Sequence, residues 1–150
     1  MEINDLLIRV ATVADLPAIL QLYAQPELDN GVVLSSVEAE KIFARMSRYP
    51  DYRLYVAIRS EQIVGTYALL IMDNIGHQGA PSAVVEDVAV DPSCQGQGIG
   101  KSMMQHALAF AKGKGCYKLA LSSNVKRHRA HQFYESLGFE KHGYSFKITL

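Results

Sequence analysis

The sequence predicts a single domain of the α/β or α+β class, built around a mixed sheet. Several segments alternate apolar and polar residues, as half-buried strands do. Others repeat apolar residues at helical spacing, and a glycine-rich turn joins one strand to the following helix. In chain order these segments give β-α-α-β-β-β-α-β-α-β, which is typical of one sheet covered by helices.

The first half of the chain is expected to hold three strands and two helices. Thr12 has a side chain suited to cap the first helix, and Ser35 with Glu38 fits a capping box for the second. The two later strands are close enough in sequence to form an antiparallel hairpin. The expected segments are a strand over Leu6–Ala11, helices starting at Thr12 and at Ser35 or Ser36, a strand around Leu54–Ile58, and a strand over Ile63–Met72.

The second half is expected to alternate strands with helices. Its segments are a strand over Ala83–Val90, a helix from about Ile99 to Gly113 or Gly115, a strand over Lys118–Ser122, a helix over Arg127–Leu137, and a strand over His142–Leu150. The last of these carries apolar residues at every second position from Tyr144 to Leu150. This period of two predicts a strand with one buried face.

Composition is ordinary for a globular protein and excludes several classes of function. The 150 residues are 49% hydrophobic and 20% charged, which suits one domain spanning residues 1–150. A formal net charge of zero argues against nucleic-acid binding, and the apolar runs are too short to span a membrane. Acidic Glu2 and Asp5 predict no signal peptide. Cys94 and Cys116 are expected to be free thiols in a cytoplasmic protein, and no residue spacing suggests a metal site.

The glycine-rich stretch Gln95–Ser102 is the most informative part of the chain. It lies between a predicted strand and a predicted helix, where backbone N–H groups and the helix dipole favour phosphate. A Walker A loop would need glycine at position 95, and the dinucleotide fingerprint would need glycine at position 101. The spacing therefore predicts a phosphate-binding loop that belongs to neither nucleotide motif, although nucleotide binding remains a third hypothesis because of Gly100-Lys101-Ser102.

Two motifs together resemble the GNAT superfamily of acetyl-CoA-dependent N-acetyltransferases. Gln95, Gly98 and Gly100 match the pattern Q/R-x-x-G-x-G/A, and Ala130–Phe139 is similar to the segment A-x-x-F-Y-E-x-x-G-F. The resemblance implies an acyltransferase (EC 2.3.1.-) that uses acetyl-CoA as co-substrate and no metal. It also implies a mostly antiparallel sheet of about six to seven strands with about four helices.

The resemblance also indicates which residues would bind the cofactor. Backbone N–H groups of the glycine loop would hold its phosphates, and the strand before the loop would pair with the pantetheine arm. Val88 N–H is expected near the thioester carbonyl. For Asn124 a helix cap or turn is about equally plausible, and His131 is nearly as plausibly a solvent-facing residue. The cofactor-binding set is Val88, Ala89, Val90, Gln95, Gly96, Gln97, Gly98, Ile99, Gly100, Lys101, Ser102, Asn124, His131 and Tyr134.

Tyr134 and Glu86 are the candidate catalytic residues. Tyr134 occupies the tyrosine position of the F-Y-E segment and would protonate the departing thiolate, although a core tyrosine is the alternative. A phenol pKa of about 10 against a thiol pKa of about 8.5 makes that transfer uphill by only about 2 kcal/mol. Glu86 would accept the amine proton, while strand alternation turns the adjacent Asp87 to the opposite face. Which of the two carboxylates is the base stays open.

The acetyl acceptor is expected to be a primary amine of a small molecule, attacked directly in a ternary complex. His77 and Glu86 are the candidate acceptor-binding residues, although a loop histidine in solvent is the commoner case. The alternatives are a CoA-binding regulatory domain without turnover and a protein acetyltransferase acting on lysine or N-terminal amines. The segment Ser122–Tyr134 resembles the aminoalkylphosphonate acetyltransferases, whereas Gly115–Lys118 is similar to the glucosamine-phosphate acetyltransferases. No nucleic-acid or membrane partner is expected, and a homodimer is a possible assembly.

Overall fold

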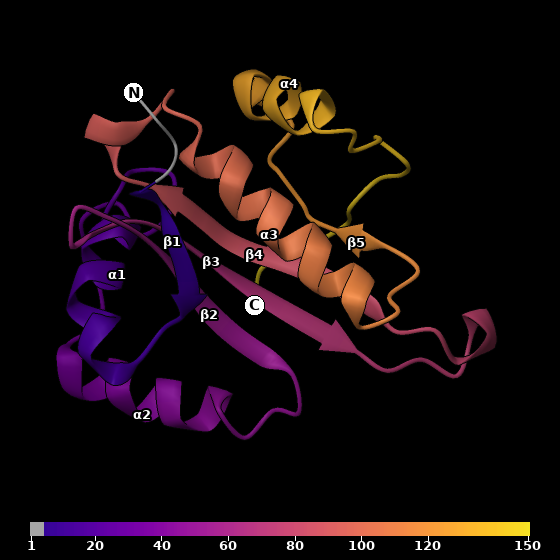
Figure 1. Cartoon of the computed structure of the whole chain (residues 1–150), viewed down its shortest axis with the longest axis horizontal. Helices are drawn as coiled ribbons and strands as arrows, with labels where there is room; N and C mark the ends of the chain where they lie inside the picture. The colour runs from indigo at the N-terminus through magenta and orange to yellow at the C-terminus, as the bar shows by residue number, and fades with distance from the viewer. Residues whose placement is uncertain (1–4) are drawn as a thin grey trace. The chain divides into compact units, whose positions relative to one another are not determined.

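The computed structural model describes residues 5–150, so the expectation based on Glu2 lies outside the described residues. The chain divides into two compact units, one ending at Ala120 and the other comprising Leu121–Leu150 (Figure 1). The first unit contains the whole sheet, and the second contains the last helix and the C-terminal tail.

The sheet has five strands in the order β1-β2-β3-β4-β5, which is also their order in the chain. Strands β1 to β4 pair with one another in antiparallel fashion, and β5 pairs with β4 in parallel. The strands are β1 (Leu7–Val10), β2 (Tyr52–Arg59), β3 (Gln62–Met72), β4 (Ser82–Val90) and β5 (Leu119–Ala120). The mixed, mostly antiparallel sheet is the fold class that the sequence predicts.

One of the two predicted helix caps lies at the start of an α-helix. The helices are α1 (Leu16–Tyr23), α2 (Ser36–Met46), α3 (Ile99–Gly113) and α4 (His128–Ser136). Ser35 caps α2, its Oγ accepting the Glu38 backbone N–H at 3.3 Å. At Thr12 the first element is instead a short 3-10 turn, Val13–Asp15, which leads into α1. Within residues 5–150 no helix is both long and apolar enough to cross a membrane.

Helices α1 and α2 pack on one face of the sheet, and α3 packs on the other (Figure 1). Leu54 and Val56 of β2 and Ala68 of β3 are buried against Leu16 and Ile19 of α1. On β2 and β3, the residues that alternate with Leu54, Val56 and Ala68 face the opposite side of the sheet, because side chains alternate along a strand. Where the strands are regular, the period of two in the sequence therefore assigns a residue to one of the two faces of the sheet.

Helix α3 packs closely against β3 on its face of the sheet. A Cβ placed on Gly65 would lie 2.8 Å from Met103 Sδ, so a larger residue there would force the Met103 side chain to shift. Tyr67, also on β3, is fully buried, and its hydroxyl lies 2.6 Å from His106 Nδ1 of α3. Tyr55 stacks on Tyr67 with ring centroids 5.1 Å apart. The Tyr67–His106 hydrogen bond thus ties α3 to the middle of the sheet.

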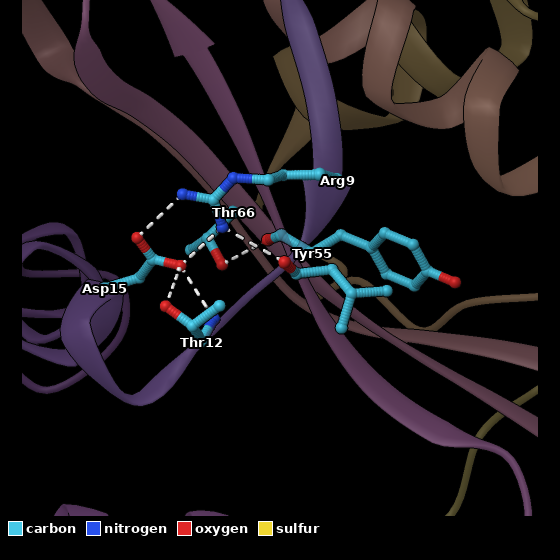
Figure 2. A network of polar contacts seen from close by, with 6 residues as sticks. Arg9, Thr12, Asp15, Tyr55 and Thr66 are labelled. Atoms are coloured by element: carbon cyan, nitrogen blue, oxygen red, sulfur yellow. Dashed lines mark hydrogen bonds and ion pairs between the residues drawn. The ribbon is translucent and has the colours of Figure 1, made fainter.

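A second polar network fixes the start of α1 to β1 (Figure 2). Arg9 donates to both carboxylate oxygens of Asp15, at 2.6 and 3.0 Å, and Thr12 N–H donates to Asp15 Oδ2 at 2.7 Å. These donors hold the pKa of Asp15 below its usual range, mainly through Arg9. Beside this network, the Thr66 hydroxyl donates to the Tyr55 carbonyl at 2.8 Å and links β3 to β2.

The C-terminal part departs from the prediction. The sheet has five strands rather than six to seven, and the expected strand over His142–Leu150 is absent. The expected strand over Lys118–Ser122 is present but shortened to Leu119–Ala120. In the tail, Tyr144, Phe146 and Ile148 are at least 86% exposed. An alternating pattern produces a strand only where a neighbouring strand supplies backbone hydrogen bonds. No strand of residues 5–150 pairs with the tail.

Candidate active site

A bulge in β4 is the central irregularity of the sheet. The register pairs Thr66 with Ala89 and then Ala68 with Glu86, so Tyr67 alone stands opposite both Asp87 and Val88. Two residues opposite one is the definition of a β-bulge. Asp87 adopts a φ of 53°, in the left-handed region that residues other than glycine seldom occupy. The bulge lies at the position where the sequence places the candidate base.

The bulge overturns the expectation that Asp87 faces away from Glu86. Strand alternation fails where an extra residue is inserted, and both carboxylates now act on the same neighbour, Tyr52 of β2. Burial raises the pKa of Tyr52, and the charges of Asp87 and Glu86 raise it further. Asp87 also raises the pKa of Tyr23 on α1, after the larger effect of burial. The two carboxylates therefore lie on the α1 side of the sheet.

The charge of Asp87 acts on its neighbour Glu86. Desolvation raises the pKa of Glu86, and the negative charge of Asp87 raises it further. The pKa of Asp87 is raised by its own desolvation and by the charge of Asp29. A carboxylate with a raised pKa is a stronger base than an ordinary surface carboxylate. Either Glu86 or Asp87 can thus accept a proton from a neighbouring amine.

Strand β4 has an open edge beyond the point where β5 ends. The ladder between β4 and β5 has two pairs, Ala83 with Leu119 and Val84 with Ala120. From Val85 to Val90, no strand among the described residues pairs with this edge of β4. An extended ligand with amide groups fits such an edge in the way an added strand does. Val88, Ala89 and Val90 lie on this open stretch.

The glycine loop follows the open edge directly. The Val90 carbonyl accepts the side-chain amide of Gln25 at 3.0 Å and that of Gln95 at 3.5 Å, which anchors the end of β4. Gly96 and Gly98 then adopt φ values of 76° and 82°. Both values lie in the left-handed region, which glycine enters without a Cβ clash. The backbone conformation of the loop therefore explains why residues 96 and 98 are glycines.

Helix α3 begins immediately after the loop, with Gly98 at its N-cap. The first bond of the helix runs from Ser102 N–H to Gly98 O at 3.0 Å. The N–H groups of Ile99, Gly100 and Lys101 precede it, and a helix provides no acceptor for N–H groups in its first turn. These donors and the helix dipole form a site suited to phosphate. Lys101 and Gln97 are exposed at the same helix end.

The remaining predicted cofactor residues belong to the unit Leu121–Leu150. The carboxamide oxygen of Asn124 accepts Lys126 N–H at 2.9 Å, so this side chain closes a turn, as the alternative interpretation expected. His131 Nε2 lies 2.8 Å from the Asn124 carbonyl oxygen. Asn124 and His131 therefore hold each other in one local arrangement at the start of α4.

Tyr134 lies on α4 between two aromatic neighbours. Its ring is 5.1 Å from that of Phe133 and 5.7 Å from that of Phe139. Burial raises the pKa of Tyr134, and the positive charge of Arg127 partly offsets this. The phenol consequently keeps its proton at neutral pH, which is the state required of a proton donor.

His77 lies away from the glycine loop. It belongs to a 3-10 turn, His77–Gly79, in the loop that precedes β4, whereas the glycine loop follows β4 (Figure 1). Its ring stacks on Tyr117 with centroids 4.0 Å apart. The structure thus brings His77 together with Tyr117 and places it at the opposite end of β4 from the glycine loop.

Sequence reasoning missed several residues around the site. Tyr23, Asp29 and Tyr52 interact electrostatically with the bulge carboxylates but belong to segments that carry no motif. Arg59 donates to Cys94 Sγ at 3.4 Å, which puts a cation next to the glycine loop. One signal was available, because the consecutive acids Glu86-Asp87 interrupt an apolar strand. Such an interruption is compatible with a bulge.

The acetyltransferase (GNAT) family model matches residues 16–139 of the chain. The chain belongs to this family. It is 34% identical to the glucosamine 6-phosphate N-acetyltransferase of Trypanosoma brucei brucei, with 99% of each chain covered. The family assignment makes the protein an acyltransferase of the N-acetyltransferase type, and members of the family use acetyl-CoA as co-substrate.

Solved structures of similar proteins share the fold. A Trypanosoma brucei acetyltransferase superposes with a TM-score of 0.84 at 34% identity, covering 97% of this chain and 100% of that one. A protein described as a transcriptional regulator from Bacillus halodurans C-125 has a TM-score of 0.89 at 28% identity, with 97% and 99% covered. The GNAT fold of the chain therefore rests on neighbours that it matches over nearly their whole length.

Replacing Gly96 by alanine is expected to weaken acetyl-CoA binding. A Cβ at Gly96 would meet no protein atom within 4 Å, so its steric effect falls on a ligand at the loop, and its φ of +76° adds backbone strain. A penalty of about 1–2 kcal/mol in the complex corresponds to a loss of affinity of roughly 5- to 30-fold. Isothermal calorimetry with acetyl-CoA measures this.

Gly115→Ala is the matched control for that experiment. Gly115 has a φ of +78° and equally open surroundings, but it follows the C-terminal end of α3. Both substitutions should lower the melting temperature to a similar degree, and only Gly96→Ala should change the Kd for acetyl-CoA. Equal affinities of the two variants would remove the glycine loop from the cofactor site.

Proposed function

We propose that the protein transfers the acetyl group of acetyl-CoA to a primary amine of a small molecule, by direct attack in a ternary complex. The observation that carries this proposal is the bulge in β4. It gathers two carboxylates with raised pKa on one side of the strand, next to an open strand edge that leads into the glycine loop. Strand β4 thus offers both a base and an open edge along which an extended cofactor would bind.

The residues of the first unit fit acetyl-CoA. The N–H groups of the loop and of the first turn of α3, from Gly96 to Ser102, would hold its pyrophosphate. The open edge at Val88, Ala89 and Val90 would pair with the amides of the pantetheine arm. Val88 N–H, in the bulge, would donate to the thioester carbonyl oxygen and stabilise negative charge there. From the second unit, Asn124 and His131 would contribute polar contacts.

Acetyl-CoA supplies an activated acetyl group, whose carbonyl carbon forms the new C–N bond as the C–S bond breaks. Glu86 removes a proton from the acceptor ammonium, directly or through water, and so frees the nitrogen lone pair. Its raised pKa supports this role, because the carboxylate is then closer in basicity to the amine. Tyr134 donates its phenolic proton to the sulfur, which leaves as a thiol, and the second proton that the nitrogen loses as the amide forms passes to the resulting tyrosinate. No covalent enzyme intermediate is needed.

The acceptor is proposed to be a small amine that reaches the α1 side of the bulge. Similarity over the full length to a glucosamine 6-phosphate N-acetyltransferase makes that amino sugar the first candidate. The carboxylates of Asp29, Glu86 and Asp87 act on this region and attract a cationic ammonium group. A polycationic amine without phosphate is therefore the second candidate.

All 150 residues are proposed to act as one acetyltransferase domain. The family match runs from residue 16 to residue 139 and thus extends across the boundary at Ala120 between the two compact units. Candidate residues for the reaction also come from both units, Glu86 from the first and Tyr134 from the second.

A panel of amines tests the proposal. Acetyl-CoA consumption is followed with glucosamine 6-phosphate, a polyamine, an aminoglycoside and a lysine-containing peptide, each at the same concentration. Turnover of a small amine supports the proposal. Turnover of the peptide alone would make the protein a protein acetyltransferase. Tight CoA binding without turnover of any amine would favour a regulatory role, for which the resemblance to a protein described as a transcriptional regulator gives a specific reason.

Tyr134→Phe is expected to lower kcat by about 10²- to 10⁴-fold, the usual contribution of a general acid. The ring and its contacts with Phe133 and Phe139 are kept, so acetyl-CoA affinity and melting temperature should change little. Tyr117→Phe is the control, because that phenol is assigned no role in the reaction. A Tyr134→Phe enzyme with undiminished kcat would eliminate Tyr134 as the acid.

Asp87→Asn is expected to move the acidic limb of the pH profile of kcat/KM to lower pH. The negative charge of Asp87 raises the pKa of Glu86, so its removal lets Glu86 lose its proton at lower pH. Asparagine tolerates the left-handed φ of 53° at this position, which protects the bulge. Glu86→Gln, measured alongside, should abolish the acidic limb together with most of the rate.

The same two variants decide which carboxylate is the base. If Asp87→Asn loses nearly all activity while Glu86→Gln keeps a normal profile, Asp87 and not Glu86 accepts the amine proton.

A further inference from the structure

Arg59, the last residue of β2, is a half-buried cation beside the glycine loop. Its Nη2 donates to Cys94 Sγ at 3.4 Å, and Cys94 directly precedes the loop Gln95–Ser102. A thiol sulfur is a weak acceptor, whereas a guanidinium has five N–H donors. Within residues 5–150, no ion pair involves Arg59. Most of its donors are therefore available to an anion.

The carboxylate of Asp91, at the end of β4, is already engaged in the turn that leads to the loop. Its Oδ1 accepts the Ser93 N–H at 2.8 Å and the Ser93 hydroxyl at 2.7 Å. The hydroxyl and then the N–H of Ser93 lower the pKa of Asp91. Asp91 thereby caps the 3-10 turn Pro92–Cys94. This acid stabilises the turn, and Arg59 keeps its charge unpaired next to the loop.

The register of the sheet locates Arg59 relative to β4. Strands β2 and β4 run in the same direction, because each is antiparallel to β3. Ala57 lies opposite Gly65, and Gly65 lies opposite Val90, so Arg59 is two residues beyond the level at which β4 ends. Its neighbour Ile58 packs in the cluster formed with α1, so strand alternation turns Arg59 to the face that α3 covers.

We infer that Arg59 binds the 3′-phosphate of acetyl-CoA and makes the site selective for that group. The inference rests on the proposed binding of the pyrophosphate by the glycine loop. A cofactor that follows the edge of β4 from Val88 to Val90 and then the loop carries its adenosine end beyond β4, where Arg59 lies. The 3′-phosphate is a monoester with a charge of about −1.5 to −2 at pH 7, so it needs a cation.

Lys101, in the first turn of α3, is the other cation next to the loop, but it suits a different role. Its ammonium is exposed and acts as a strongly hydrated point charge. The guanidinium of Arg59 is half-buried and already oriented by Cys94, and its fork of N–H donors matches two oxygens of one phosphate. Lys101 is therefore expected to attract every phosphate of the cofactor, and Arg59 to recognise one.

The affinities for CoA and for 3′-dephospho-CoA, measured by calorimetry without an acceptor amine, test the inference. Wild-type protein is expected to bind CoA more tightly by about tenfold, the effect of one charge-assisted contact. Arg59→Gln should raise the Kd for CoA to that for 3′-dephospho-CoA and leave the latter unchanged. Arg59→Lys keeps the charge without the fork and should retain part of the difference.

Arg53→Gln and Lys101→Gln are the matched controls. Arg53 lies on the same face of β2 at its other end, where its guanidinium donates to the carbonyls of Tyr49 and Tyr52. Arg53→Gln should keep the wild-type ratio of the two Kd values, even if the melting temperature falls. Lys101→Gln should weaken both ligands to a similar degree and so also keep the ratio.

Three results would overturn the inference. One is wild-type protein that binds CoA and 3′-dephospho-CoA equally. Another is an Arg59→Gln variant that weakens both ligands alike or neither of them. The last is a ratio that is lost in Lys101→Gln and kept in Arg59→Gln. Each result leaves the proposed acetyl transfer standing, because that proposal is tested by turnover of amines, whereas these measurements contain no acceptor.

Discussion

The bulge at Asp87–Val88 is the constraint on which the candidate site depends. One extra residue in β4 brings two consecutive carboxylates to bear on Tyr52, where a regular strand would send them to opposite faces. The residue opposite the bulge, Tyr67, is fully buried and lies 2.6 Å from His106 on α3. The β3 residue that faces the bulge is thus hydrogen-bonded to the helix that begins at the glycine loop.

The first unit has the features of a strand-like binding edge that ends in a phosphate site. Pairing with β5 stops at Val84, the open edge continues to Val90, and the chain then turns through two left-handed glycines into α3. Each of these features has a separate physical cause. The open edge results from the shortness of β5, the turn needs residues without a Cβ, and the helix start leaves its N–H groups available. The order of these features along the chain, from β4 through the glycine loop to α3, suits a long ligand with amides at one end and phosphates at the other.

Local sequence signals predicted much of this architecture. The Ser35 cap, the start of α3 after Gly98 and the assignment of β2 residues to two faces depend on neighbours within a few positions, and the structure agrees with them. The bulge was not predicted, because it is a property of the register between two strands and not of either one alone. The same reason applies to the tail. Its alternation predicts a strand, and that prediction is wrong, because a strand also needs a partner and no strand of residues 5–150 supplies one.

Amide hydrogen exchange with and without acetyl-CoA is the most direct test that one cofactor occupies both the open edge and the glycine loop. The account predicts slower exchange at Val88–Val90 and, in the same complex, at Gly96–Ser102, because a ligand would accept or shield those N–H groups. Residues of β1, at the far side of the sheet, should be unaffected and serve as the internal reference. Protection of the loop without protection of the β4 edge, or saturation with acetyl-CoA that changes neither segment, would contradict the account.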